Sequence, residues 1–398
     1  MRVLILSQTF FPEPDLKCLP LARYLHAQGH EVQVLTAFPN YPGGILYPGY
    51  QLRPWSREII DGIPVLRVAC YLSHNRNGVQ RAMSYLSFAV ACLLALPLLK
   101  FRPDTIYIYN LVTLVPVAAM ARAMWCSKMV IDVQDLWPES VTASGMIRGR
   151  SVLRLLGSIC DRAYQTVDHV IAQSPGFASQ LVHRGIPDCR VKVIYNWSPH
   201  ELPVSPTSDM SASEDFHFVY AGNVGTVQAL DVAVEAAEKC RGTLPQVRFT
   251  IIGTGTDFER LRTKAYGLSN VSFHGWMLPE SLAPILANAS ALLLHLADDP
   301  VFRITIPSKL QQYLQVGRPI LCGVAGDASH LVAAAGAGLT FSPGDTADLI
   351  RALTDFVTMS AEARQAMAAR GAVYYEQQLA RKHGLAAIER VLQAENVV

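Results

Sequence analysis

The sequence predicts an α/β fold made of two Rossmann-like domains that face each other across a cleft. A chain of 398 residues exceeds the usual limit of one hydrophobic core. Short β-branched runs alternate with amphipathic helical segments in both halves, a pattern typical of parallel sheets with crossover helices. Residues 197–216 are rich in Pro, Ser and acidic residues, lack periodicity and separate the two series, so we interpret them as a linker.

Ten apolar runs are the predicted strands of the two sheets. In the first half they are "RVLIL", "EVQVLT", "TIYIY", "KMVIDV" and "HVIAQS"; in the second they are "FHFVYAG", "VRFTIIG", "VSFHG", "ALLLHL" and "RPILCG". Their apolar residues are continuous rather than alternating, as expected for strands buried on both faces. We therefore predict an N-terminal domain over 1–198, a linker over 199–216 and a second domain over 217–375.

Charge and cysteine content narrow the class of protein. Residues 1–200 hold 19 Lys and Arg against 12 Asp and Glu, a formal charge of +7, and the rest of the chain holds 15 against 20. This asymmetry favours an anionic partner for the first half, or else a solvated basic surface, and no basic run indicates nucleic acid. Eight scattered cysteines indicate neither a metal site nor a disulfide framework. Because "MRVLIL" begins as a strand rather than as a signal peptide, we expect a cytoplasmic protein.

The stretch "SYLSFAVACLLALPLLKF", residues 84–101, allows three interpretations. A membrane-spanning helix needs about 20 apolar residues, whereas this run is slightly short and contains Pro97. We place a core helix first and a helix lying in a membrane surface second, because positive charge flanks the run. The flanking residues are Arg76, Arg81, Lys100 and Arg102.

Two glycine turns follow predicted strands of the second domain. In "YAGNVGTVQALD" a strand ends at Tyr220, Gly222 and Gly225 follow, and a helix is expected from about Gln228. Converging backbone amides and a helix N-terminus predict a phosphate- or sugar-binding loop, although an ordinary strand-to-helix turn has the same pattern. "IIGTGTDFERL" lacks the third glycine and the acidic residue of a dinucleotide fingerprint, so we interpret Gly253 and Gly255 as a structural turn.

A third element is the helix predicted to run from Pro307 and Ser308 to Gly317. Ser308 is the expected N-cap, and the positive end of the helix dipole should point into the cleft, with Arg303 and Lys309 adding charge. These groups can neutralise a diphosphate as it becomes a leaving group. The alternative is a surface helix with incidental basic residues.

Polar residues also follow a buried strand of the first domain, in "IDVQDLWPES". Asp135 and Glu139 leave this strand where α/β sheets bind ligands, with Trp137 and Pro138 as a rigid apolar wall, although Asp135 could also cap a helix. The loop from Ala37 to Tyr50 is full of Pro, Gly and Tyr. Such loops contact ligands or membranes, or run over the surface.

Six segments occur in order over nearly the whole chain: "FPNYPGGILYPGY", "DVQDLWPES", "NW", "YAGNVGTVQALD", "NVSFHGW" and "TIPSKLQQYLQVGRPIL". This ordered set resembles the retaining glycosyltransferases of family 4, and most closely the branch of the N-acetyl-L-fucosamine transferases of O-antigen assembly. The resemblance implies the GT-B fold, with an N-terminal acceptor domain and a C-terminal nucleotide-sugar domain. It also implies a last helix, here 376–398, that returns to the N-terminal domain.

The resemblance also implies the residues of a donor and an acceptor site. A nucleotide sugar, expected to carry uridine, would be bound by Gly222, Asn223, Gly225, Gly253, His274, Gly275, Trp276, Arg303, Ser308, Lys309 and Gln312. The acceptor would meet Lys17, Asn40, Tyr41 and Trp137. Asp135 is the first candidate for orienting the acceptor hydroxyl and Glu139 is the second.

The chain departs from the family pattern at several of these positions. Two glutamates of many relatives correspond to Ile304 and Gln312, and a histidine corresponds to Gln134. The phosphate-binding Arg and Lys of the glycine loop correspond to Asn223 and Gln228. We therefore expect Arg303 and Lys309 to supply the positive charge at the helix start.

By the same resemblance, the reaction transfers a sugar from a UDP-sugar, with retention, to a polyprenyl-diphosphate-linked saccharide at the inner face of the cytoplasmic membrane. The products would be O-antigen, capsule or exopolysaccharide. No Asp-x-Asp motif occurs, so neither a metal nor another cofactor is expected. The alternatives are a GT-B nucleotide-sugar epimerase and a catalytically impaired nucleotide-sugar-binding partner. The sequence leaves the donor sugar, the linkage and the oligomeric state open.

Overall fold

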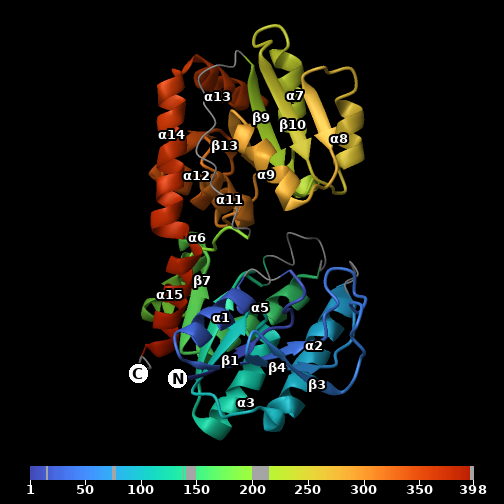
Figure 1. The fold of residues 1–398 in the computed structure, drawn as a ribbon, viewed down its shortest axis with the longest axis vertical. Helices are drawn as coiled ribbons and strands as arrows, with labels where there is room; N and C mark the ends of the chain where they lie inside the picture. Colours follow the sequence, from blue (N-terminus) through green and yellow to red (C-terminus); the bar gives the residue numbers. More distant parts are fainter. Residues whose placement is uncertain (15–16, 74–77, 138, 140–148, 200–214, 395–398) are drawn as a thin grey trace. The chain divides into compact units, whose positions relative to one another are not determined.

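The computed structural model describes residues 1–14, 17–73, 78–137, 139, 149–199 and 215–394 (Figure 1). Most of the predicted linker, together with Arg76 and Pro138, lies outside these residues. The chain divides into two units, Met1–Ile194 with Leu385–Val398 and Tyr195–Gly384, here called unit 1 and unit 2. Each unit has its own mainly parallel sheet with helices, which confirms the predicted fold class.

The sheet of unit 1 has eight strands in the order β3-β4-β2-β1-β5-β6-β7-β8. All neighbours are parallel except β3 and β4, which form an antiparallel hairpin. The strands are β1 (Arg2–Leu6), β2 (Glu31–Ala37), β3 (Trp55–Ile60), β4 (Ile63–Val68), β5 (Thr105–Tyr109), β6 (Lys128–Val133), β7 (His169–Ala172) and β8 (Val191–Val193). The hairpin and β8 were not among the predicted strands.

The helices of unit 1 connect these strands. They are α1 (Cys18–Ala27), α2 (Gly78–Ala95), α3 (Val115–Trp125), α5 (Arg150–Thr166) and α6 (Pro175–His183), with short 3-10 turns at Leu96–Leu98, Val112–Leu114 and Asp188–Arg190. The N-terminus of α6 is capped by Ser174, whose hydroxyl accepts from the Phe177 amide at 3.1 Å. Parallel strands joined by helices bring the carboxyl ends of β1, β5 and β6 to one edge of the sheet.

The sheet of unit 2 has six parallel strands in the order β11-β10-β9-β12-β13-β14. The strands are β9 (Phe216–Ala221), β10 (Val247–Ile252), β11 (Val271–His274), β12 (Ala291–His295), β13 (Ile320–Gly323) and β14 (Gly338–Thr340). The five predicted strands of this half correspond to β9 to β13. Since β9, β10 and β11 are neighbours, the three loops that leave their carboxyl ends are neighbours as well.

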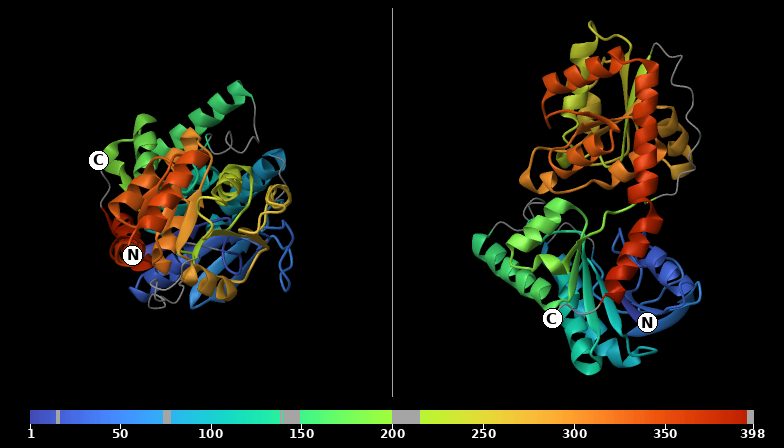
Figure 2. Two further views of the ribbon diagram at one scale, coloured as in Figure 1. Left: turned by 90° about the horizontal axis from the view of Figure 1, so that it is seen from above. Right: turned by 90° about the vertical axis from the view of Figure 1, so that its left-hand side faces the viewer.

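Helices cover both faces of the unit 2 sheet, as the views in Figures 1 and 2 agree. Alternate residues of β9 enter different cores, because successive side chains of a strand point to opposite faces: Phe218 packs with α7, α8 and α13, and Val219 with α9, α11 and α12. The helices are α7 (Asp231–Cys240), α8 (Phe258–Lys264), α9 (Pro279–Asn288), α10 (Pro300–Arg303), α11 (Ser308–Val316), α12 (Asp327–Ala334), α13 (Thr346–Thr358) and α14 (Ala361–Tyr374), and a 3-10 turn spans Thr226–Gln228.

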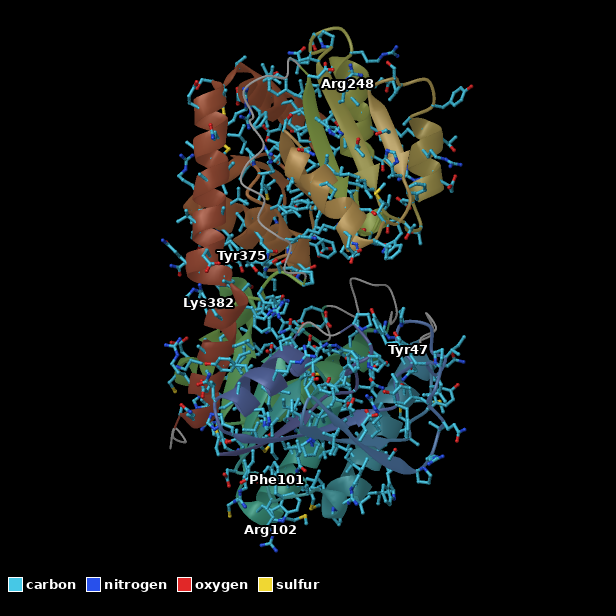
Figure 3. The ribbon with its side chains drawn as sticks, in the orientation of Figure 1. Tyr47, Phe101, Arg102, Arg248, Tyr375 and Lys382 are labelled. Atoms are coloured by element: carbon cyan, nitrogen blue, oxygen red, sulfur yellow. The ribbon has the colours of Figure 1, made fainter. Side chains whose placement is uncertain are left out.

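The end of the chain leaves unit 2 through a helical segment and enters unit 1. A π-helical turn (Tyr375–Leu379) follows α14, and α15 (Arg381–Gln393) begins in unit 2 and ends in unit 1. Figure 3 shows Tyr375 and Lys382 on this segment. The Tyr375 hydroxyl accepts from the Ser198 amide at 3.3 Å. Within unit 1, Glu389 of α15 accepts from the Tyr24 hydroxyl at 2.8 Å, and the Lys128 ammonium donates to the Val391 carbonyl at 2.6 Å.

The apolar stretch 84–101 forms most of α2 and the turn after it. One side of the helix is buried in unit 1 through Ser84, Phe88, Cys92 and Ala95. By length and composition, Gly78–Leu98 is long and apolar enough to cross a membrane, a property that core helices share. Only 28% of its most apolar window is buried, so this helix presents a large apolar surface to solvent.

Candidate functional site

The glycine loops after β9 and β10 pack backbone against backbone. Gly222 and Gly253 have positive φ angles of 137° and 141°, which side chains rarely allow. A Cβ on Gly253 would lie 1.8 Å from the Gly222 carbonyl oxygen, and one on Gly255 would lie 2.2 Å from the Val224 carbonyl oxygen. The Val224 amide also donates to the Thr254 carbonyl at 2.9 Å. These glycines are therefore required for close contact between two loops at the carboxyl ends of the strands.

Lys309, in the first turn of α11, lies directly over the first of these loops. A Cβ on Gly222 would be 2.1 Å from the Lys309 Cε, so the glycine makes room for the lysine. The ammonium donates to the Tyr220 hydroxyl and lies 4.1 Å from the centre of the Tyr220 ring. Burial lowers the pKa of Lys309 to about 7. In the part of the chain that the structure describes, no carboxylate forms an ion pair with this lysine.

A hydrogen-bond network inside the loop holds its backbone in place. The Tyr220 hydroxyl donates to the Asn223 carbonyl at 2.5 Å. The Gln228 side-chain oxygen accepts from the Asn223 side chain at 2.9 Å and from the Gly225 amide at 3.0 Å. Asn223 and Gln228, where the family resemblance led us to expect cations, thus bind each other and close the loop from within. The loop itself carries no charge, and Lys309 provides the positive charge next to it.

The structure corrects two predicted helix starts around this loop. Helix α7 begins at Asp231 rather than near Gln228, because Ala229 adopts a left-handed conformation after the 3-10 turn. The N-cap of α11 is Pro307 rather than Ser308; proline has no side chain that can accept, and its φ of −62° and ψ of 136° suit the extended cap position. Ser308 is the first helical residue and is exposed. Helix α11 ends as predicted, at Gly317 with a positive φ.

The other predicted donor residues follow neighbouring elements. His274 ends β11, next to β10, and Gly275 and the 68% exposed Trp276 come directly after it. Gln312 lies one turn beyond Ser308 on α11 and is partly buried. Arg303 ends α10, where its guanidinium donates to both carboxylate oxygens of Asp298 at 3.0 and 3.1 Å. Arg303 shares its charge with Asp298 in an exposed ion pair, so Lys309 is the better placed of the two cations, and a donor contact of Arg303 stays a prediction.

In unit 1, the predicted catalytic carboxylate Asp135 is exposed just beyond the carboxyl end of β6. It accepts from the side chain of Asn110, which follows β5, at 3.0 Å, and the Asn110 oxygen accepts from the Asp135 amide at 3.1 Å. Asn110 adopts a left-handed conformation with φ of 62°. Glu139 instead pairs with Arg184 at 3.5 Å, and Arg184 also binds Asp161. Asp135 is therefore the less engaged of the two carboxylates.

A buried ion pair lies under Asp135. The Lys17 ammonium donates to Asp132 of β6 at 2.7 Å, and both side chains are fully buried. The Tyr107 hydroxyl donates to the same oxygen at 2.6 Å, and Gln134 donates to the other oxygen. Lys17 therefore supports β6 from inside the domain, which corrects the expectation that it contacts the acceptor. An aspartate within an apolar strand is a signal that sequence reasoning missed, because such residues are rarely buried unpaired.

The loop that carries Asn40 and Tyr41 is attached to another buried carboxylate, Glu13. Its oxygens accept from the backbone amides of Phe10, Asn40 and Tyr41 at 3.0, 2.7 and 2.7 Å. Burial raises the pKa of Glu13, and the three amides act in the opposite direction. The Asn40 side chain is buried and donates to the Phe38 carbonyl, whereas Tyr41 is 39% exposed. Tyr41 is thus better placed than Asn40 to meet a ligand.

Two family models match the chain and together span most of its length. The model described as "Glycosyl transferase 4-like domain" matches residues 17–197, and the model described as "Glycosyl transferases group 1" matches residues 215–359. The chain is a family 4 glycosyltransferase. The glycosyltransferase is 26% identical, over 319 residues, to WcaI of Escherichia coli (strain K12), which is provisionally assigned as a colanic acid biosynthesis glycosyl transferase. The match covers 75% of this chain and 76% of WcaI.

Solved structures share the fold of the glycosyltransferase over almost its whole length. Anabaena Alr3699/HepE in complex with UDP matches with a TM-score of 0.68 at 14% identity, covering 98% of this chain and 99% of that chain. WaaG, a glycosyltransferase involved in lipopolysaccharide biosynthesis, matches with a TM-score of 0.68 at 16% identity, covering 99% of this chain and 100% of that chain. At these identities the likeness establishes the GT-B fold.

Proposed function

We propose that the glycosyltransferase moves a sugar from a UDP-sugar, with retention of anomeric configuration, to a polyprenyl-diphosphate-linked saccharide during synthesis of a surface polysaccharide. The observation that carries the donor part is Lys309, which lies over Gly222 at the carboxyl end of β9 without a carboxylate partner among the described residues. A diphosphate bound there would gain a charge-assisted hydrogen bond. HepE, which shares the fold, was solved in complex with UDP, and this supports the choice of nucleotide.

In the proposed reaction, the protein stabilises the leaving diphosphate without a metal ion. Lys309 and the first-turn amides of α11 would neutralise the charge that develops on the β-phosphate. Asp135 would orient the acceptor hydroxyl, because it is exposed at the edge of the sheet and its position is fixed by Asn110. Glu139 remains the second candidate. Attack from the face that the diphosphate leaves requires little help from a protein base.

The acceptor and the cellular location belong to the same proposal. Unit 1 includes most of the basic half of the chain and the apolar surface of α2, which fit a protein bound peripherally to the inner face of the cytoplasmic membrane. WcaI is provisionally assigned to colanic acid biosynthesis, and WaaG acts in lipopolysaccharide biosynthesis, so both relatives support a surface polysaccharide as the product. The resemblance to N-acetyl-L-fucosamine transferases makes an amino or deoxy sugar the first donor to test.

The first experiment measures the melting temperature of the full chain with UDP, GDP, ADP, TDP or NAD, with and without Mg²⁺. We expect UDP to stabilise the protein most and Mg²⁺ to leave the shift unchanged, since ligands that bind the folded state raise its melting temperature. A larger shift with another nucleotide, or a shift that requires Mg²⁺, would contradict the corresponding part of the proposal. Transfer is then tested by incubating the protein with a UDP-sugar and a polyprenyl-diphosphate-linked saccharide. The sugar should leave the donor and appear on the saccharide. Conversion of the donor alone would indicate an epimerase, and binding without turnover an impaired partner.

A further inference from the structure

Unit 1 contains an apolar groove between three helices that the donor site does not use. Helix α3 packs against both α2 and α5, and the groove between them has a volume of about 420 Å³. Its lining includes Leu86 of α2, Pro116 and Ala119 of α3, and Leu156 and Ile159 of α5. Arg162 is the charged residue among the lining residues. A groove of this composition suits a hydrocarbon chain rather than a sugar or a nucleotide.

The helices that form the groove also carry much of the exposed apolar surface. Of the 23 large hydrophobic side chains exposed among the described residues, 11 lie on α2, α3 and α5. On α2 they follow a helical stripe, formed by Val79, Met83, Leu86, Val90, Leu93 and Leu94. The exposed fraction reaches 73% at Leu94. A concentration of this size marks a binding surface rather than ordinary solvent-exposed residues.

Two residues that line the groove are close in the chain to Asp135, the carboxylate assigned above to the acceptor, or to its partner Asn110. Trp137, which lines the groove, comes two residues after Asp135, and its ring packs edge-on against Tyr85 of α2 with centroids 5.9 Å apart. Leu111, which also lines it, directly follows Asn110, the partner of Asp135. The groove lining therefore includes the residue directly after Asn110 and the residue two positions after Asp135.

The charge around the groove favours an anionic occupant. Arg154 and Arg162 of α5 are exposed, and Arg81 of α2 donates to the Tyr85 hydroxyl at 3.0 Å beside the groove. On the same three helices the sequence holds one acidic residue, Asp161, which pairs with Arg184 at 2.5 Å. Apolar walls with exposed arginines at the rim match a molecule that has a phosphate at one end and a long hydrocarbon chain behind it.

We propose that this groove binds the first part of the hydrocarbon chain of the lipid-borne acceptor, next to its phosphate. The phosphate lies at the rim near Arg162, and the saccharide extends towards Asp135. This inference rests on the proposed function, because it defines where the acceptor of that reaction is held. It distinguishes binding of one lipid chain from adsorption of the whole apolar face to a bilayer.

The test uses farnesyl phosphate, a single 15-carbon isoprenyl chain on a phosphate, and the full-length protein without a donor. Ala119→Trp places an indole in the groove, and Ala123→Trp places the same group one turn further along α3, at an exposed position outside the groove lining. By calorimetric titration, we expect wild type and Ala123→Trp to bind farnesyl phosphate equally. Ala119→Trp should bind at least tenfold more weakly, and methyl phosphate should bind none of them measurably.

Two controls make the result independent of the donor site and of folding. Stabilisation by UDP is measured on the same three proteins, and it should be equal in all of them because the substitutions lie in unit 1. Arg162→Gln should weaken binding of farnesyl phosphate but not of farnesol. Equal loss in both tryptophan variants, or no preference for farnesyl phosphate over methyl phosphate, would overturn the groove proposal. Failure of UDP to stabilise the wild-type protein would instead count against the proposed function.

Discussion

At the scale of single residues, the site is determined by which charges are compensated. Arg303 and Lys309 are equivalent in the sequence, but Arg303 pairs with Asp298 whereas Lys309 lies over Gly222 and contacts Tyr220. Asp135 and Glu139 are likewise equivalent in the sequence, but Glu139 pairs with Arg184. In each pair, the structure leaves one charge more available to a ligand than the other.

The pKa of Lys309 predicts how UDP binding depends on pH. Because burial lowers this pKa to about 7, the ammonium loses its charge as the pH rises through 7, and UDP affinity should fall between pH 7 and 9. The terminal phosphate of UDP has a second pKa of about 6, so UDP gains negative charge as the pH rises, and a fall in affinity therefore reports the protein. Lys309→Met should bind UDP about tenfold more weakly at pH 6.5, a cost of about 1.4 kcal/mol, and should lose the pH dependence. Titration calorimetry at several pH values measures both effects; equal pH dependence in the variant would contradict this assignment.

The same residue should influence stability in a direction that can be checked. The folded-state pKa of Lys309 lies below its unfolded value of 10.5, so the unfolded chain binds more protons between about pH 7 and 10.5. The contribution of this group to stability therefore rises with pH across that window. Relative to Lys309→Met, the free energy of unfolding of the wild-type protein should increase from pH 7 to 10, as denaturant titration would measure. A constant difference would show that the ammonium is not destabilised by burial.

A separate prediction concerns the effect of Asp135 on turnover. Asp135→Asn preserves the size of the side chain but removes the negative charge that would orient the acceptor hydroxyl. We expect kcat to fall by about 100-fold because the acceptor hydroxyl is no longer held in position, with UDP affinity unchanged. Asp161→Asn, which removes a carboxylate paired with Arg184, is the control. An equal fall in both variants would remove Asp135 from the proposed mechanism.

At the scale of elements, two contacts position the functional residues. In unit 2 the loops after β9 and β10 touch through glycine backbones, and in unit 1 the buried pair of Lys17 and Asp132 joins the start of α1 to β6. Both contacts connect elements that are far apart in the sequence. Substitutions there should act on the site through the backbone rather than through a ligand contact.

Gly253→Ala tests the contact between the glycine loops. The added Cβ would lie 1.8 Å from the Gly222 carbonyl oxygen, on a residue whose φ is already 141°, so the loops must separate. We expect a lower melting temperature and little or no stabilisation by UDP. Gly242→Ala is the matched control, because its Cβ meets nothing within 4 Å. A thermal scan with UDP reports both quantities, and normal stabilisation of Gly253→Ala would show that the loop contact is dispensable.

Lys17→Met tests the buried pair. Removing the ammonium leaves the Asp132 carboxylate without its cation, which should destabilise the protein by about 3–5 kcal/mol. The exposed pair of Arg2 and Asp104, at 2.6 Å, provides the comparison, and Arg2→Met should cost much less because solvent screens an exposed pair. Urea denaturation measures both values. Similar costs for the two variants would mean that the buried pair adds no more than a surface pair.

At the scale of the whole molecule, each unit has a sheet and candidate residues of its own. The residues predicted to bind the donor belong to unit 2, and those predicted to contact the acceptor belong to unit 1. The C-terminal segment belongs to both, since the boundary at Gly384 falls within α15. Binding of a nucleotide alone should therefore be detectable in unit 2 and not in unit 1.

Hydrogen exchange with and without UDP tests this division. Protection should increase in the segments around 222–228, 253–257 and 308–312, which form the proposed diphosphate site. The β5 and β6 segments of unit 1 should exchange at unchanged rates. UDP protection confined to unit 1 would contradict the assignment of the donor site.

The sequence by itself determined the fold class and ten of the fourteen strands of the described residues, and it proposed the neighbourhood of the candidate site. These follow from local signals, because continuous apolar runs, glycine turns and the end of α11 at Gly317 depend on residues close together in the chain. It missed the hairpin β3–β4. Strand β3, "WSREII", alternates exposed and half-buried residues and has no apolar run, whereas β4, "IPVLRV", is mostly buried and was missed in spite of its apolar residues. It also misplaced the starts of α7 and α11, where Ala229 and Pro307 decide the backbone.

Only the tertiary structure decided which side chains within that neighbourhood are available. Lys17 looked like a ligand contact until its partner Asp132, 115 residues away, became visible. Lys309 acquires its low pKa from the burial created by Tyr220 and Gly222, 89 and 87 positions earlier in the chain. The physical reason is the same in both cases: pairing and burial are set by neighbours in space, and these neighbours come from strands that only the folded sheet brings together.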